Sequence, residues 1–121
     1  MGYGDTRMIA VIFEVETRKG KQKNYLEFAR ELRPLVDKID GFISIERFES
    51  LTNPGKMLSL SFWRDEKAIA EWRNISEHRQ AQKAGRDSIF SDYRIRIAAV
   101  TRDYGMRKTN ETPPDSKKFH A

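Results

Sequence analysis

The sequence predicts an α+β fold whose segments follow the order strand, helix, strand, strand, helix, strand. Three observations support this prediction. Four short segments alternate apolar and polar residues, two longer segments carry apolar residues at helical spacing, and turn residues separate them. This order is the ferredoxin-like βαββαβ arrangement, whose right-handed crossovers place the helices on one face of a four-stranded antiparallel sheet.

The first half of the chain supplies three strands and a helix. Residues 8–16 alternate as a strand that is largely apolar on both faces, and residues 21–38 carry an apolar stripe at helical spacing. Alternation returns over residues 42–50 and again over residues 57–63. The turn sequence Thr-Asn-Pro-Gly at residues 52–55 lies between these two strands, so they are expected to pair as a hairpin.

The second half supplies the remaining helical segment and strand. Asp65 is placed to cap a helix over residues 66–74, because an aspartate before a helix accepts a hydrogen bond from a free backbone N–H. A helical pattern resumes over residues 76–88, and residues 93–104 alternate as the last strand. Residues 8–104 are therefore expected to form the domain.

The two ends of the chain lie outside this pattern. Residues 1–7 are interpreted as an N-terminal extension, and residues 105–121 have almost nothing to bury, so we expect a flexible tail. A length of 121 residues is typical of one domain. No apolar run approaches the roughly 20 residues of a membrane span, and the N-terminus lacks a signal-peptide pattern. A cytoplasmic protein without membrane attachment is therefore expected.

Composition argues against several kinds of site. The chain has no cysteine, which excludes disulfides, cysteine–histidine zinc sites and thiol nucleophiles. Its two histidines are far apart and its glycines are scattered, so neither a metal nor a bound cofactor is expected. The net charge of +5 raises nucleic acid as a partner, but acidic and basic residues alternate without a continuous basic stripe, so nucleic acid is not an expected partner.

The apolar character of both faces of the strands predicts a homodimer. Helices cover one face of such a sheet, and leaving the other in water would expose a larger apolar patch than monomers usually carry. Packing two sheets face to face removes it and forms a barrel-like core shared by two copies. Val11, Leu60 and Ile97 are candidates for one of the two packed faces.

Two tryptophans and a histidine are expected to converge where the sheet meets a helix. Trp63 ends the third strand, Trp72 lies on the next helix, and His78 follows six residues later. These side chains are candidate walls of an aromatic-lined pocket. The alternative is that both indoles only fill the space between sheet and helix, and that His78 is a surface residue at a helix start.

With these segments the chain resembles the antibiotic biosynthesis monooxygenase family of dimeric α+β barrels. The residues that carry the resemblance are Phe62-Trp63-Arg64-Asp65-Glu66, Glu71-Trp72, Ser76-Glu77-His78-Arg79 and Asp92-Tyr93-Arg94-Ile95-Arg96. The resemblance covers roughly residues 8–104. It implies oxidation of polycyclic aromatic phenols without metal or flavin, in which the substrate itself passes electrons to O₂.

The resemblance and the aromatic cluster together give a set of candidate site residues. His78 is the candidate general base, because its unperturbed pKa lies near neutrality. The candidate pocket residues are Trp63, Trp72, Phe90, Phe13 and Tyr93. The expected ligand is a small aromatic or quinol-like molecule.

Two alternative functions stay open. The first is a non-catalytic dimer of the same fold that binds a small molecule or another protein. The second is haem degradation, whose branch of the superfamily carries a histidine ten residues after the helix tryptophan and an asparagine on the first strand. Gln82 and Phe13 stand at those positions here, and His78 is expected to face elsewhere, which disfavours haem.

Four polar residues of the predicted strands have both a functional and a structural interpretation. Arg47 and Arg96 are candidates to bind an anionic oxygen, or else pair with carboxylates at the sheet edge. Ser59 and Ser61 share a face of the third strand. They either bond a ligand hydroxyl or make room for a bulky neighbour.

Overall fold

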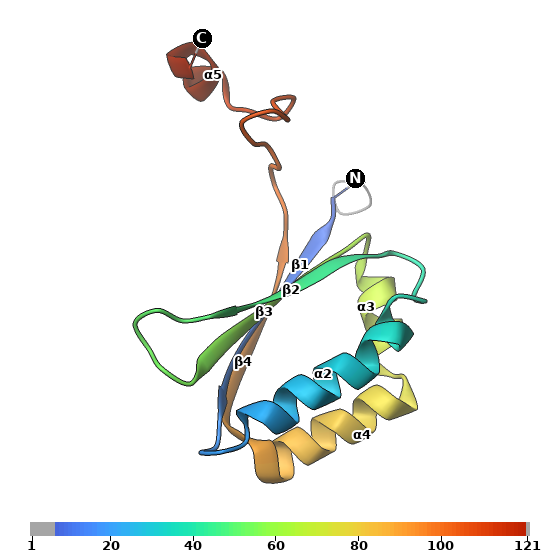
Figure 1. Ribbon diagram of the computed structural model, residues 1–121. Coiled ribbons are helices and arrows are strands. Elements are labelled where there is room, and N and C mark those ends of the chain that lie inside the picture. The colour runs from blue at the N-terminus through green and yellow to red at the C-terminus, as the bar shows by residue number, and fades with distance from the viewer. Residues whose placement is uncertain (1–6, 121) are drawn as a thin grey trace.

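The computed structural model describes residues 7–120 and confirms the predicted α+β, ferredoxin-like element order (Figure 1). The helices and strands begin and end close to the predicted residues in the first half of the chain, and less close to them in the second half. The elements are β1 (Ile9–Thr17), α2 (Gln22–Val36), β2 (Phe42–Glu49), β3 (Lys56–Trp63), α3 (Glu66–Arg73), α4 (Ser76–Ala84), a π-helical turn (Gly85–Ile89), β4 (Phe90–Ala99) and α5 (Pro114–His120).

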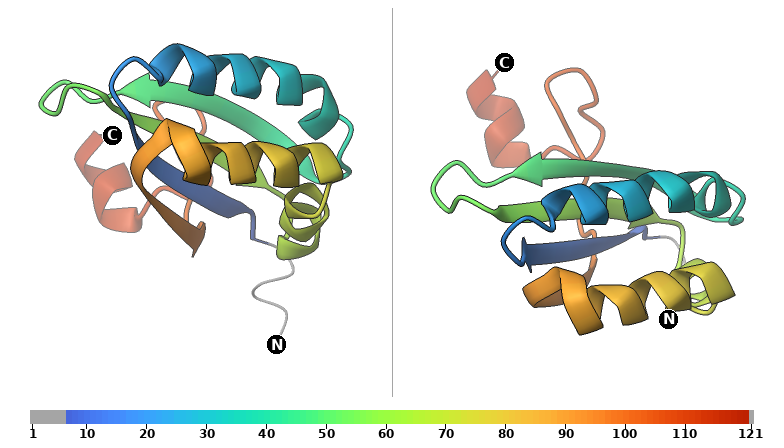
Figure 2. Two further views of the ribbon diagram at one scale, coloured as in Figure 1. Left: turned by 90° about the horizontal axis from the view of Figure 1, so that it is seen from below. Right: turned by 60° about the horizontal axis from the view of Figure 1, so that its bottom comes forward.

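The four strands form one antiparallel sheet in the order β2-β3-β1-β4. β1 is therefore central and pairs with β3 on one side and β4 on the other. Helices α2 and α4 lie side by side across one face of this sheet (Figure 2). The domain thus has one layer of helices and one layer of strands, and no helix of residues 7–120 packs across the other face of the sheet.

The helix-covered face holds the core. On this face Ile9 lies opposite Trp63, and Val15 lies opposite Met57 across the β1–β3 pair. Side chains of the helices complete two buried clusters against it. The first cluster is Ile9, Val36, Trp63, Ala68 and Ile69, and the second is Val15, Tyr25, Met57 and Ile89.

The helix-free face is also apolar over β1 and β3. Ile12 lies opposite Leu60, and Ala10 lies opposite Phe62. The expectation that Val11, Leu60 and Ile97 share a face is wrong for Leu60: Val11 and Ile97 are opposite each other on the helix-covered side. Neighbouring residues of a strand point to opposite faces, so a shift of one position changes the assignment. The homodimer stays a prediction.

Polar side chains border the helix-free patch at one end. Glu14 makes ion pairs with Lys56, at 2.9 Å between Nζ and Oε1, and with Arg96. The hydrogen bond from Lys56 and then that from Arg96 hold the pKa of Glu14 below its usual value. This cluster matches the structural interpretation of Arg96, which pairs with a carboxylate on the face opposite the helices.

The corner between β3 and α3 forms as predicted. Asp65 Oδ1 accepts a hydrogen bond from Ala68 N at 2.9 Å, which is the predicted helix cap, and this bond is the main reason that the pKa of Asp65 is lowered. Gly41 packs against this corner with φ +97, and a Cβ there would lie 2.9 Å from that of Ala68. Glycine is required here because it adopts this positive φ without strain and because it has no Cβ to contact Ala68. The corner fixes Trp63 at the end of β3.

The second half of the chain departs from the prediction at three boundaries. The helix predicted over residues 76–88 ends at Ala84 and continues as the π-helical turn, and β4 begins at Phe90 rather than at residue 93. β4 also ends at Ala99, five residues early, because its partner β1 begins at Ile9. Beyond the bond from Val100 N to Met8 O, no strand of residues 7–120 pairs with this segment.

After β4 the chain leads away from the sheet to α5, which lies apart from α2 and α4 (Figure 1). No helix was expected at these residues. Flexibility of the tail stays a prediction. None of the helices within residues 7–120 combines the length and apolarity that crossing a membrane requires.

Candidate functional site

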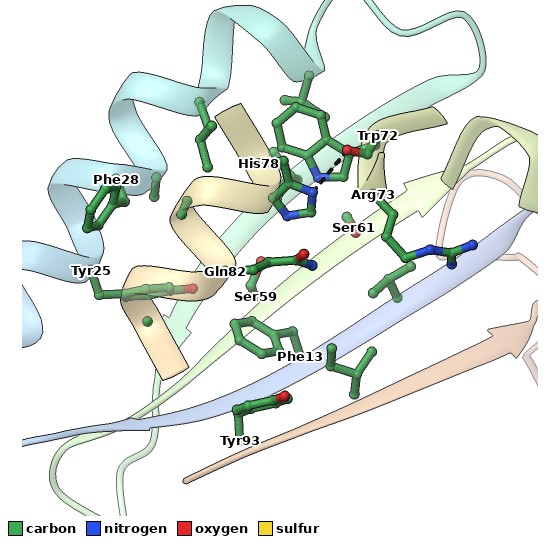
Figure 3. Close-up of a pocket in the computed structure, with 18 of the residues that line it drawn as sticks. Phe13, Tyr25, Phe28, Ser59, Ser61, Trp72, Arg73, His78, Gln82 and Tyr93 are labelled. Atoms are coloured by element: carbon green, nitrogen blue, oxygen red, sulfur yellow. Dashed lines mark hydrogen bonds between the residues drawn. The ribbon is translucent and has the colours of Figure 1, made fainter. Parts of the chain in front are cut away.

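A cavity of about 470 Å³ lies between the helix-covered face of the sheet and the helices α2 and α4 (Figure 3). Its volume is in the usual range of small-molecule sites. All six candidate site residues line it: Phe13, Trp63, Trp72, His78, Phe90 and Tyr93. Other walls come from Val11, Tyr25, Phe28, Leu32, Ile45, Arg47, Ser59, Ser61, Ile69, Gln82, Ile95 and Ile97.

Four aromatic rings pack together at one end of the cavity. Phe13 of β1 lies 5.9 Å from Phe90 and from Tyr93 of β4, measured between ring centroids, and Tyr25 of α2 lies 5.8 Å from Phe90. The rings meet at tilted or edge-to-face angles, which are favourable for aromatic pairs. Because each ring supports the others, this end offers a firm apolar surface to a planar ligand.

At the other end, His78 stacks on Trp72. The two rings are 4.4 Å apart between centroids and 18° from parallel. His78 Nδ1 lies 3.0 Å from the backbone oxygen of Trp72. A carbonyl oxygen only accepts hydrogen bonds, so Nδ1 carries the proton and Nε2 of the neutral ring keeps its lone pair. The stack and the bond together fix the orientation of the imidazole.

The protonation state of His78 follows from its surroundings. Burial lowers its pKa below the ordinary value of 6.5, and the charge of Arg79 lowers it further, while the bond to Trp72 opposes these effects. The imidazole is therefore neutral at neutral pH. A neutral imidazole with a free Nε2 is suited to accept a proton.

The expectation that His78 faces away from the position of Gln82 is wrong. The two residues are four apart on α4, so they lie on the same face of the helix, and both line the cavity (Figure 3). The helix is continuous between them, and i, i+4 spacing is close to one full turn. The cavity thus holds one imidazole and one amide along a single wall.

Trp63 serves the core as well as the cavity wall. It is only 2% exposed, its ring meets Phe42 at 5.2 Å between centroids, and its Nε1 donates to Ser61 Oγ at 2.8 Å. Ser61 is therefore occupied by the indole. Trp72 also lines the cavity but is only half-buried. The two tryptophans, which were equal candidates from the sequence, thus differ: Trp63 is mainly a core residue and Trp72 mainly a cavity residue.

Arg47 differs from Arg96 in its surroundings. It lies on the helix-covered face of β2 opposite Ser59, and its Nε donates to the hydroxyl of Tyr25 at 3.3 Å. Its guanidinium carbon lies 5.8 Å from the centroid of that ring. Arg47 and Arg96 were equal candidates from the sequence, and the contact with Tyr25 distinguishes Arg47.

The cavity has no acidic wall residue among residues 7–120, and that part of the chain contains no group of three or more His, Asp or Glu side chains arranged to hold a metal ion.

Comparison with known proteins places this arrangement in a family. The family model described as antibiotic biosynthesis monooxygenase matches residues 8–84. The chain belongs to that family. The match includes Phe13, Trp63, Trp72, His78 and Gln82, so most of the cavity lies within the shared region.

Two relatives resemble this family member in sequence. A jasmonate monooxygenase of Pyricularia oryzae is 48% identical over 94 residues, which are 78% of this chain but 44% of the relative. The chain thus spans less than half of that protein. The uncharacterized protein YqjZ of Bacillus subtilis is 30% identical over 93 residues, covering 77% of this chain and 79% of the relative.

Solved structures support the fold assignment alone, because their identities are low. The structure of Rv0793 from Mycobacterium tuberculosis has a TM-score of 0.72 at 15% identity and covers 81% of this chain and 99% of its own. The structure of SO0527 from Shewanella oneidensis has a TM-score of 0.71 at 14% identity. It covers 78% of this chain and 92% of its own.

The π-helical turn after α4 shapes the aromatic end of the cavity in this family member. Gly85 is buried, and a Cβ built on it would lie 2.5 Å from Phe90 Cε2. We expect Gly85→Ala to push the ring of Phe90 into the cavity and to lower the free energy of unfolding by about 1–3 kcal/mol, the usual cost of overpacking. Urea denaturation measures this change.

Gly105→Ala is the matched control, because a Cβ at Gly105 would meet no atom within 4 Å. If the two variants were equally stable, the close approach of Gly85 to Phe90 would not be structurally important.

Proposed function

We propose that the protein is a monooxygenase that binds a small, mostly apolar molecule in the cavity and oxidises it with O₂, without metal or flavin. The family supports oxygenase chemistry, and the resemblance described above supports a cofactor-free reaction. The observation that carries the proposal is the orientation of His78. Its Nε2 lone pair is available in an apolar cavity of suitable size.

A substrate with an acidic CH₂ group next to phenolic rings fits this chemistry. His78 takes a proton from it, and the resulting anion donates an electron to O₂. The net reaction is R–CH₂–R′ + O₂ → R–CO–R′ + H₂O, in which the substrate supplies all four electrons that O₂ accepts. No external reductant is needed. The apolar walls keep water away from the reactive anion.

Jasmonate is a second candidate substrate, through the 48% identical relative that bears its name. Hydroxylation of a saturated carbon consumes two electrons and two protons in addition to O₂. An assay with jasmonate therefore includes ascorbate as a two-electron donor. The assay with a polycyclic phenol does not, and the difference separates the two chemistries.

Oxygen consumption tests the proposal. Purified protein is mixed with dithranol, a polycyclic phenol with an acidic CH₂ group, or with jasmonate and ascorbate, and oxygen uptake is recorded above the uncatalysed rate. We expect uptake with at least one of them. Calorimetric binding of both molecules with no uptake would favour the non-catalytic alternative. Because His78 places an imidazole in the cavity, haem is a further control ligand, and a shifted Soret band would favour haem chemistry.

His78→Gln tests the role of the base. Glutamine keeps a polar side chain but accepts protons poorly, so we expect kcat to fall about 10²- to 10⁴-fold. His120→Gln is the matched control, because α5 lies apart from the helices α2 and α4 (Figure 1) and contributes no residue to the lining of the cavity. An unchanged kcat in His78→Gln would remove His78 from the mechanism.

The pH dependence gives an independent check. A base acts only when it is unprotonated, so kcat/KM is expected to fall as the pH drops through the pKa of His78. Because burial lowers that pKa, the acid limb is expected below the ordinary value of 6.5 rather than above it. If the acid limb persisted unchanged in His78→Gln, the titrating group would be a residue other than His78.

A further inference from the structure

We propose that the cavity selects ligands that carry a carboxylate on an apolar body, and that Arg47 binds the carboxylate. This inference deepens the proposed function, because it names a chemical class for the molecule that the same cavity takes. It depends on the charges of the wall, on the surroundings of Arg47, and on a buried serine opposite it.

The charged residues of the cavity wall are all basic. They are Arg33, Arg47, Arg73, Arg79 and Arg86, and within residues 7–120 no aspartate or glutamate lines the cavity. A cleft lined by one sign of charge attracts ligands of the other sign. Most of these arginines are exposed at the rim. Two have other partners: Arg33 pairs with Asp37, and Arg79 bonds to Asn74.

Arg47 is the half-buried member of this set. In the described part of the chain it has no ion-pair partner, and its hydrogen bond runs from Nε to the neutral hydroxyl of Tyr25. Partly buried guanidinium groups are usually paired with an anion, because removing their hydration is costly. The terminal nitrogens of Arg47 form a planar fork whose geometry matches a carboxylate.

Ser59 supplies a further donor next to Arg47. The two residues are directly opposite in the β2–β3 pair, and Ser59 is only 6% exposed. The hydroxyl of Ser61, two residues further along the same strand, accepts from Trp63 Nε1. Tyr25 accepts from Arg47, so its own proton is free to donate. Guanidinium, serine and tyrosine donors thus lie next to one another on this wall, where a carboxylate would accept from them.

The rest of the ligand then lies against apolar walls. Phe13, which is opposite Ser59 on β1, begins the aromatic cluster with Phe90 and Tyr93. A carboxylate at Arg47 therefore places an attached ring or aliphatic body beside these rings. His78 lies across the cavity from this cluster, on α4 (Figure 3).

Calorimetry under argon tests the inference with 2-naphthoate and its neutral methyl ester. We expect the acid to bind about 10- to 100-fold more tightly than the ester, the usual effect of hydrogen bonds to a charged group. Arg47→Met is expected to remove this preference, and Arg47→Lys to restore part of it. Arg73→Met, at the exposed rim, is the control and is expected to keep most of it.

Ser59→Ala is expected to weaken binding of 2-naphthoate several-fold and to leave the ester unchanged, which a general loss of folding would not do. Equal affinities for acid and ester, a preference that survives Arg47→Met, or no heat with either ligand would each overturn the inference. The measurement involves no oxygen, so it is independent of turnover. Oxygen uptake without a carboxylate preference would leave the proposed function standing and refute this inference alone.

Discussion

Leu60→Glu is expected to abolish the folded dimer and to leave a destabilised monomer or an unfolded chain. Leu60 lies on the helix-free face, opposite Ile12 of the central strand β1. If two copies pack these faces together, a new carboxylate at Leu60 meets apolar side chains of both. A buried carboxylate without a partner costs several kcal/mol, and the symmetry of a dimer introduces two of them.

Leu51→Glu is the matched control, because Leu51 is 100% exposed and the substitution is chemically identical. Sedimentation velocity at micromolar concentration measures the outcome for both variants. The wild-type protein and Leu51→Glu are expected to sediment as dimers, and Leu60→Glu is not. Wild-type protein that sediments as a folded species of 14.2 kDa would refute the dimer.

Trp63→Ala is expected to lower the free energy of unfolding by about 3–5 kcal/mol, the usual loss for a buried tryptophan. The substitution empties the space between the end of β3 and α3, and it removes the ring that packs on Phe42. It also removes the indole N–H that Ser61 accepts at 2.8 Å, in a buried position. Urea denaturation followed by circular dichroism measures the change.

Trp72→Ala is the comparison that separates core from cavity. Trp72 is half-buried and stacks on His78, so its removal is expected to cost less stability. It is expected to weaken ligand binding instead, because it frees the imidazole and enlarges the cavity. If both variants lost the same stability, the distinction between a core tryptophan and a cavity tryptophan would be wrong.

The fold was largely predictable because each segment carries its own pattern. Alternation marks the strands, and Asp65 caps α3 as its position suggests. The faces of the sheet were not predictable in the same way. Val11 and Leu60 both look apolar, and only the pairing register shows that Leu60 lies on the helix-free face. Local sequence does not encode that register when both faces are apolar.

The residues that line the site were easier to predict than the contacts between them. Phe13, Trp63 and His78 were named from residue type and position, and all three line the cavity. Their partners come from distant segments. Arg47 is distinguished from Arg96 only by contact with Tyr25 on α2, and the shared face of His78 and Gln82 required an unbroken α4. The π-helical turn at Gly85 likewise depends on its packing against Phe90.

The proposed function requires oxygen chemistry in a cavity that shields a substrate anion beside His78. The mass of the product formed under ¹⁸O₂ in ordinary water tests this claim most directly. We expect dithranol, or jasmonate in the presence of ascorbate, to gain one heavy oxygen atom per molecule in the presence of the protein, at a rate that falls in His78→Gln. No product above the uncatalysed background, or a product whose new oxygen comes from water, would contradict the account.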